Sequence, residues 1–147
     1  MTLFADSSAI VKRYADEAGH AVIRSISEPL VVSTLARVEV HAALWRKARL
    51  GDIEDSDVSI LGNEFESDWW GSDDRAAAFT IIAVNDVVLD GAIVQVARHG
   101  LRAYDAMQLA SAVSARGVEA SIDSFACFDV ELRRAAVREG FALVPAD

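Results

Sequence analysis

The chain has 147 residues, of which 52% are hydrophobic and 25% are charged, and its formal net charge at pH 7 is -9. A chain of this length can bury one sizeable core, so we expect a single domain over residues 1–147. No apolar run reaches the roughly 18 residues that a membrane-spanning helix needs, and residues 1–6 lack the basic start and long apolar stretch of a signal peptide. These features predict a cytoplasmic protein without a membrane span.

Short apolar runs alternate with longer helical patterns along the chain. The segments that predict strands are residues 2–5, 30–32, 79–84, 125–128 and 141–144. The segments that predict helices are residues 7–15, 16–27, 35–50, 56–70, 86–99, 103–116 and 130–139. Strands separated by helices predict an α/β fold, with a mainly parallel sheet of about five strands that is covered by helices.

The available residue types restrict how the chain could bind a metal. Cys127 is the single cysteine, and the histidines at 20, 41 and 99 lack the spacing of a zinc motif. A metal site would therefore consist mainly of carboxylates. The negative net charge argues against nucleic-acid binding, but carboxylates that hold a divalent cation do not repel a phosphate once the ion is bound.

Two aspartates directly follow predicted strands. Asp6 comes after residues 2–5 and Asp129 after residues 125–128, and each begins a predicted helix. Ligands of parallel α/β sheets bind beyond the carboxyl ends of the strands, so both side chains are expected at one edge of the sheet. The alternative is simple helix capping, because aspartate is a preferred N-cap residue.

Two further carboxylates fall on predicted buried helix faces. Glu39 lies within the stripe of its helix that we expect to face the core, which consists of Leu35, Val38, Ala42 and Trp45. A glutamate is almost never fully buried without a partner, so either a functional role or an ion pair, for example with Arg37, must explain it. Asp105 similarly lies on the apolar face of residues 103–116, in a first turn where the helix dipole favours an anion.

These four acids predict one divalent-cation site. Asp6, Glu39, Asp105 and Asp129 offer only oxygen ligands, which suit Mg²⁺ or Mn²⁺. Such a site favours phosphodiester hydrolysis by a metal-activated water, with 5′-phosphate and 3′-hydroxyl products. Asp123 is a rival for the fourth position, although Asp129 follows the better strand.

Four stretches resemble the motif regions of PIN-domain ribonucleases, most closely the VapC toxins: FADSSAIVKRY, STLARVEVHAAL, LRAYDAMQLASA and FACFDVELRRAA. The resemblance implies a three-layer α/β/α sandwich, with the four acids as the family's acidic quartet and Ser8 as the small hydroxyl residue beside the first aspartate. It also implies an endoribonuclease that depends on Mg²⁺ or Mn²⁺, forms a homodimer and is inhibited in a complex with a cognate antitoxin protein. Val130 and Glu131 depart from the pattern, because basic residues are expected after Asp129.

Phosphate binding would depend on local basic clusters. Removing the quartet from the 23 acidic residues leaves 19, against 14 lysines and arginines. The candidate clusters are Lys12 with Arg13, Arg46 with Lys47 and Arg49, and Arg98 with Arg102. We expect Arg102 to contact phosphate, whereas the alternative for each cluster is a favourable interaction with a helix dipole.

The sequence also allows other functions, and it predicts where the tryptophans and histidines lie. A non-catalytic RNA- or protein-binding module and a housekeeping nuclease remain alternatives, whereas a phosphatase of the haloacid-dehalogenase type would need an aspartate where Ser8 stands. Trp69 is expected in the core, and Trp70 is expected on the surface, where an antitoxin groove is favoured over an RNA platform. His41 and His99 are expected on helix surfaces.

Overall fold

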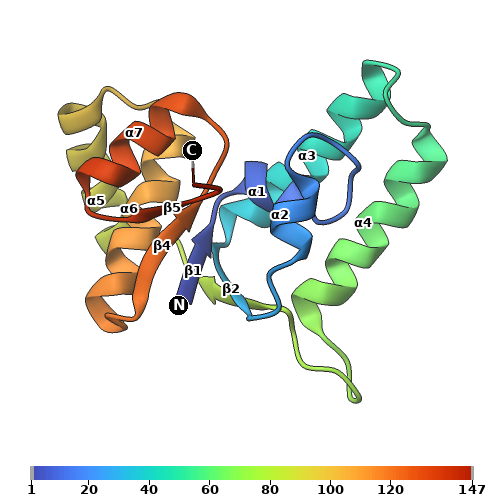
Figure 1. The fold of residues 1–147 in the computed structure, drawn as a ribbon, viewed down its shortest axis with the longest axis horizontal. Helices are drawn as coiled ribbons and strands as arrows, with labels where there is room; N and C mark the ends of the chain where they lie inside the picture. The colour runs from blue at the N-terminus through green and yellow to red at the C-terminus, as the bar shows by residue number, and fades with distance from the viewer. Residues whose placement is uncertain (1, 147) are drawn as a thin grey trace.

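The computed structural model describes residues 2–146 and contains one sheet flanked by helices (Figure 1). The strands are β1 (Thr2–Ala5), β2 (Leu30–Ser33), β3 (Phe79–Ile82), β4 (Ile122–Ala126) and β5 (Ala142–Val144). All neighbouring strands pair in parallel, in the order β3-β2-β1-β4-β5. The predicted α/β class and parallel five-stranded sheet are therefore confirmed.

Seven helices within residues 2–146 connect and cover the strands. They are α1 (Ser7–Val11), α2 (His20–Arg24), α3 (Leu35–Arg49), α4 (Asp55–Trp70), α5 (Asp86–His99), α6 (Ala103–Val118) and α7 (Val130–Arg138). Helices α1–α4 and α5–α7 gather on opposite sides of the sheet, which gives the three α/β/α layers (Figure 1). In this part of the chain, no helix has the length and apolar character that crossing a bilayer requires.

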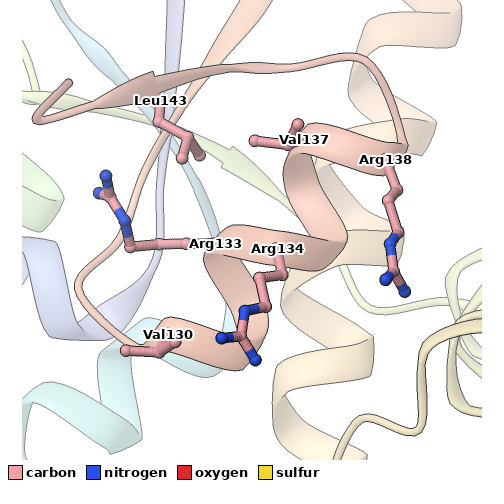
Figure 2. A pocket seen from close by; sticks show the side chains of 6 residues that line it. All are labelled: Val130, Arg133, Arg134, Val137, Arg138 and Leu143. Atoms are coloured by element: carbon pink, nitrogen blue, oxygen red, sulfur yellow. The ribbon is translucent and has the colours of Figure 1, made fainter. Parts of the chain in front are cut away.

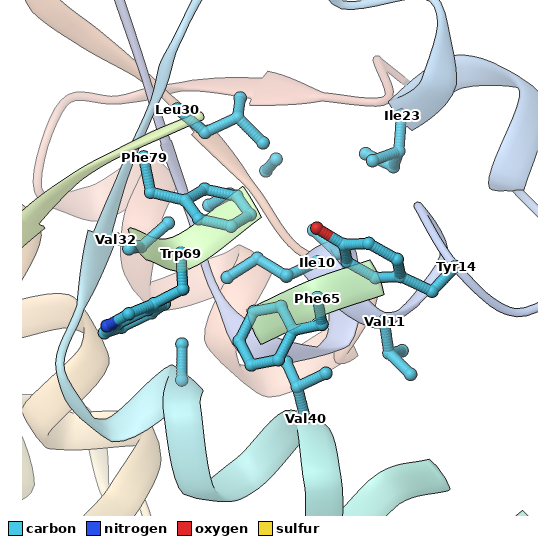
Figure 3. Packing of buried hydrophobic residues seen from close by; sticks show 14 of the residues in the cluster. Ile10, Val11, Tyr14, Ile23, Leu30, Val32, Val40, Phe65, Trp69 and Phe79 are labelled. Carbon is cyan, nitrogen blue, oxygen red and sulfur yellow. The ribbon is translucent and has the colours of Figure 1, made fainter. Parts of the chain in front are cut away.

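The core on the side of α1–α4 is built around Phe65 of α4. Its buried ring makes edge-to-face contacts with Tyr14 and Trp69 at centroid distances of 5.5 and 5.6 Å, and Phe79 of β3 lies 6.0 Å away (Figure 3). Phe65 and Trp69 belong to the apolar stripe predicted for residues 56–70, and their burial confirms that stripe. Helix α4 also packs against α3, so this core positions the helix that carries Glu39.

The core on the side of α5–α7 is built on the two central strands. Phe4 of β1 stacks on Phe125 of β4 at a centroid distance of 5.3 Å. Helix α6 packs against β2 and β4 and buries Leu109 and Ala112 of its apolar face. This packing anchors α6, whose first turn carries Asp105.

The buried face predicted for α3 is wrong. The residues that α3 buries are Ala36, Val40 and Leu44, whereas the predicted Val38 is 74% exposed and Trp45 is also exposed. Helix α3 is apolar on two adjacent faces, so periodicity alone does not show which one meets the sheet. Glu39 therefore lies on a half-exposed flank between the core and an exposed apolar face.

Several element boundaries also differ from the predictions. Helix α1 ends at Val11, and the Arg24 Nε donates to the backbone carbonyls of residues 12 and 13 just beyond it, at 3.2 and 3.1 Å. Strand β4 begins at Ile122 and ends level with β1, since Ala126 pairs with Ala5. Helix α6 continues past Gly117, which does not adopt the left-handed conformation of a helix-ending glycine. Strand β3 is shorter than the predicted segment 79–84, and although that segment is an apolar run, the strand lies at the edge of the sheet and has exposed residues.

Candidate functional site

The sheet topology brings the ends of two acid-bearing segments to one edge. Strands β1 and β4 are parallel neighbours, so the connections that follow them, with Asp6 and Asp129, leave the sheet at the same carboxyl edge. Asp6 is the N-cap of α1 and Asp129 is the N-cap of α7. Asp105 lies in the first turn of α6, and Glu39 lies one turn into α3, the helix that follows β2.

Asp6 is held at this edge in a fixed orientation. Its side chain is only 4% exposed, and its Oδ1 accepts hydrogen bonds from the Ser8 hydroxyl at 2.7 Å and from the Ala9 N–H at 3.0 Å. The Ser8 oxygen also accepts a hydrogen bond from the backbone N–H of Phe128, which ties the connection after β4 to the same point. Among the residues that the structure describes, no group donates to the Asp6 Oδ2, so that oxygen is available as a ligand.

The electrostatics place the acids close together. The pKa of Asp6 is raised to about 7, mainly by burial and also by the charges of Asp105 and Glu39, against the opposing hydrogen bonds from Ser8 and Ala9. Burial also raises the pKa of Asp105, with contributions from Asp129 and Glu39, while Arg102 lowers it. Asp105 thus interacts electrostatically with each of the other three acids, and the shared cation site remains a prediction.

Asp129 and Asp6 both cap helices, as the alternative interpretation of these residues predicted. The Asp129 Oδ1 accepts a hydrogen bond from the Leu132 N–H at 2.9 Å, as Asp6 does from Ala9. Each capping hydrogen bond uses one carboxylate oxygen and leaves the other oxygen available to a cation. Capping and cation binding are thus compatible at both positions.

Glu39 is held by residues that the sequence analysis missed. Its Oε1 accepts hydrogen bonds from the Ser7 hydroxyl at 2.9 Å and from the Gln108 Nε2 at 2.8 Å, and the same amide donates to the Ser7 oxygen at 2.9 Å. The alternative ion pair of Glu39 with Arg37 is absent, because Arg37 pairs with Glu66 at 3.1 Å. Gln108 could have been found, since it is a polar residue on the buried side of α6, one turn after Asp105.

Removing the Gln108 amide should weaken cation binding. Gln108 is 2% exposed and donates to Glu39, so Gln108→Met keeps most of the volume but leaves the carboxylate without its amide donor. Loss of such a supporting contact typically costs about 10- to 100-fold in metal affinity, so we expect the Mn²⁺ dissociation constant to rise by this factor in calorimetric titration. Gln95→Met is the matched control, because Gln95 of α5 is similarly buried and bonds none of the four acids. Equal affinities of the two variants would contradict this role.

The donor set fits a hard divalent cation. Within residues 2–146, no three His, Cys, Asp or Glu side chains form a preformed metal site. Carboxylates without a counter-ion repel each other, and a cation between them would offset both the repulsion and the burial of Asp6. Oxygen-only ligands in which one carboxylate is buried and others are reachable from solvent suit Mg²⁺ or Mn²⁺, which retain waters and bind phosphate.

The structure also places Asp123, the rival fourth ligand, and Arg102, the predicted phosphate contact. Asp123 lies near the start of β4, at the opposite end of the strand from Asp129, and its carboxylate accepts a hydrogen bond from Ser124 at 2.8 Å. It does not join the quartet. Arg102 is the exposed N-cap residue of α6, close enough to lower the pKa of Asp105, so it lies at the edge of the site.

A separate hollow of about 580 Å³ lies against α7 and β5 (Figure 2). The residues that line it are Val130, Arg133, Arg134, Val137, Arg138 and Leu143. Arg133 donates to the backbone carbonyls of Cys127 and Pro145, and Arg134 pairs with Glu131 at 3.0 Å. The helix after Asp129 therefore has its arginines further along than the family pattern implies, and none of the four acids lines this hollow.

The predictions for the tryptophans and histidines have mixed outcomes. Trp69 is buried and Trp70 is exposed, as predicted, and the Trp70 ring contacts the Arg37 guanidinium at 5.0 Å. His41 is half-buried and bonds Glu66 at 2.8 Å. The surface prediction for His99 is wrong: its side chain is 3% exposed and bonds Glu139, a residue after α7 whose proximity the helical pattern does not reveal.

Comparison with known proteins identifies the family. The family model of the PIN domain matches residues 3–137, which include all four acids. The comparison with curated proteins gave no match. PIN domains are typically metal-dependent nucleases, which agrees with an oxygen-only acidic site at the carboxyl edge of a parallel sheet. On the length of this match and on its fold, the chain belongs to the PIN-domain family.

Proposed function

We propose that this protein is a Mg²⁺- or Mn²⁺-dependent endoribonuclease and the toxin of a type II toxin–antitoxin pair. The observation that carries the catalytic part is the buried Asp6, whose pKa is raised to about 7 by burial and by the neighbouring Asp105 and Glu39. A fold that holds a carboxylate in such a place favours a cation as its partner. We place the activity in the cytoplasm.

The four acids have distinct tasks in this proposal. Asp6, through its available Oδ2, and Asp105 would hold the cation, with Glu39 and Asp129 completing the site. When bound, the ion supplies positive charge that polarises the scissile phosphate. Because Ser7 and Gln108 both donate to the Glu39 Oε1, its Oε2 is the atom that can orient the attacking water. Attack by water, rather than by the ribose 2′-hydroxyl, predicts 5′-phosphate and 3′-hydroxyl ends.

An exposed apolar face supports the proposed protein partners. Helix α5 leaves large hydrophobic side chains exposed to solvent: Val87, Leu89, Ile93, Val94 and Val96. An exposed helix face with this many apolar side chains favours contact with another protein, and we assign it to the homodimer. The exposed Trp70 is the expected contact of the antitoxin. Growth arrest on expression that is relieved by a small protein encoded beside this gene would distinguish a toxin from a housekeeping nuclease.

Cleavage of RNA by the purified protein tests the catalytic proposal. We expect end-labelled single-stranded RNA to be cut in Mn²⁺ or Mg²⁺, with 5′-phosphate ends, and to stay intact in excess EDTA. Restoring the cation after chelation should restore cleavage. Cleavage that persists in EDTA, or that leaves 2′,3′-cyclic phosphate, would contradict the mechanism, and binding without cleavage would indicate a non-catalytic module.

A further inference from the structure

A hollow of about 630 Å³ lies directly beside the quartet. Helix α3 contributes Val38, Glu39, Arg46 and Arg49 to its lining, and α6 contributes Tyr104. Glu39 belongs to the proposed catalytic site, and Tyr104 immediately precedes Asp105 in the chain. The hollow, which we call the α3 groove, is therefore continuous with the place where the scissile phosphate would lie.

The basic clusters of the chain differ in whether acidic side chains neutralise them. Lys12 and Lys47 both pair with Glu17, and Arg98 pairs with Glu139 at 2.7 Å. In contrast, Arg46 and Arg49 are exposed and have no acidic partner among residues 2–146. On a chain with a net charge of -9, Arg46 and Arg49 in the α3 groove are thus available near the site, in addition to the exposed Arg102 at its edge.

The rest of the α3 groove is apolar or aromatic. Val38 is 74% exposed and Tyr104 is 61% exposed, so neither is used to build the core. An accessible aromatic ring beside arginines is the combination that binds single-stranded nucleic acid, because a base stacks on the ring while the phosphates contact the arginines. An apolar protein segment in this groove would offer no negative charge to the two unpaired arginines at one end, whereas the phosphates of RNA would.

The spacing along α3 suits a strand that runs away from the site. With a helical rise of about 1.5 Å per residue, Arg46 lies roughly 10 Å and Arg49 roughly 15 Å along the axis from Glu39. These positions are too far from Glu39 for the arginines to contact the scissile phosphate itself. They can instead contact phosphates further along the same strand.

We propose that single-stranded RNA lies along α3, with a base stacked on Tyr104 and flanking phosphates bound by Arg46 and Arg49. This inference rests on the proposed nuclease function and names the path by which its substrate reaches the site. It also explains how an acidic protein binds RNA, since the contacts are confined to the α3 groove rather than spread over the surface.

The salt dependence of RNA binding tests the arginine contacts. Fluorescence anisotropy of a labelled single-stranded RNA would be measured over a range of salt concentrations on an Asp105→Asn background, which prevents cleavage. Each phosphate contact to a single strand contributes about -0.7 to the slope of log affinity against log salt, so Arg46→Gln with Arg49→Gln should make this negative slope shallower by about 1.4. Arg134→Gln with Arg138→Gln on α7 removes the same charge, and we expect it to leave the slope nearly unchanged.

Two substitutions of Tyr104 test the stacking contact. Tyr104→Phe keeps the ring and should retain RNA affinity, whereas Tyr104→Ala should reduce it by about tenfold or more. Because Tyr104 is exposed, both variants should melt at the temperature of the parent protein. Equal affinity of the alanine and phenylalanine variants would overturn the stacking role.

The outcomes separate this inference from the proposed nuclease function. If the wild-type protein cuts RNA but the α3 variants keep the salt slope and affinity of the parent, the RNA path is wrong and the nuclease function stands. If the protein does not cut RNA but the α3 variants bind it more weakly than the α7 control, the path is supported and the nuclease function fails. Self-association that Val38→Asp abolishes, with no loss of RNA affinity, would assign this face to a second copy and overturn the path.

Discussion

Asp105→Asn should reduce the rate of RNA cleavage by at least about a thousandfold and should not lower the melting temperature. The loss follows because charge stabilisation by a bound cation contributes several kcal/mol, and each 1.36 kcal/mol corresponds to about tenfold in rate. Stability is retained because Asp105 is repelled by Asp129 and Glu39 in the metal-free protein, and an amide removes that repulsion.

Asp123→Asn is the matched control for this experiment. Asp123 is exposed near the start of β4, at the far end of the strand from the quartet, so the same chemical change should leave cleavage unaltered. Both rates would be measured with the same RNA in Mn²⁺. Substantial activity of Asp105→Asn, or a comparable loss in Asp123→Asn, would contradict the assignment of the site.

The metal-free protein should become less stable as the pH rises from about 4 to about 7. Burial raises the pKa of Asp6 from 3.8 in the unfolded chain to about 7 in the fold. Between these values the folded state binds a proton that the unfolded state does not, so the stabilisation is complete below pH 3.8 and is lost as the pH passes 7. A shift of this size corresponds to a few kcal/mol, or on the order of 10 °C in melting temperature.

Thermal melting in EDTA at pH 5 and pH 8 measures this contribution. The pKa values of Glu17, Glu66 and Glu139 are lowered by their basic partners, so their effect has the opposite sign and acts below about pH 4.5. Asp6→Asn should remove most of the decrease in melting temperature between the two pH values. Identical pH profiles for the wild type and the variant would show that Asp6 is not the group responsible.

The positions of Asp6, Asp129 and Asp105 in the fold could be predicted because they depend on local pattern and topology alone. Asp6 follows a short apolar run and begins a helix, and so does Asp129, which places both at the carboxyl edge of any parallel sheet. Asp105 was predictable from its position in the first turn of an apolar helix. These inferences require no knowledge of which helix contacts which.

The orientation of α3 could not be predicted, because the choice between its two apolar faces depends on the shape of the core. Phe65 and the strands accept Ala36, Val40 and Leu44, and the stripe with Val38 is left exposed. Glu39 therefore lies near Asp6 and Asp105 although the predicted reason, burial on the core stripe, is wrong. Its position depends instead on Ser7 and Gln108.

Contacts between residues that are distant in the sequence also could not be predicted. Glu17 neutralises Lys12 and Lys47, and Glu139 accepts a hydrogen bond from His99. Sequence spacing reveals basic clusters but does not reveal which of them have acidic partners from another element. Only the three-dimensional structure shows that Arg46 and Arg49 remain available.

We propose that the four acids form one divalent-cation site, and calorimetric titration of Mn²⁺ into the metal-free protein tests this proposal most directly. Wild type and Asp123→Asn should bind Mn²⁺ with the same affinity, whereas Asp6→Asn and Asp105→Asn should each weaken binding by at least about tenfold, since each removes a charged ligand. Unchanged Mn²⁺ affinity in both Asp6→Asn and Asp105→Asn would contradict the claim.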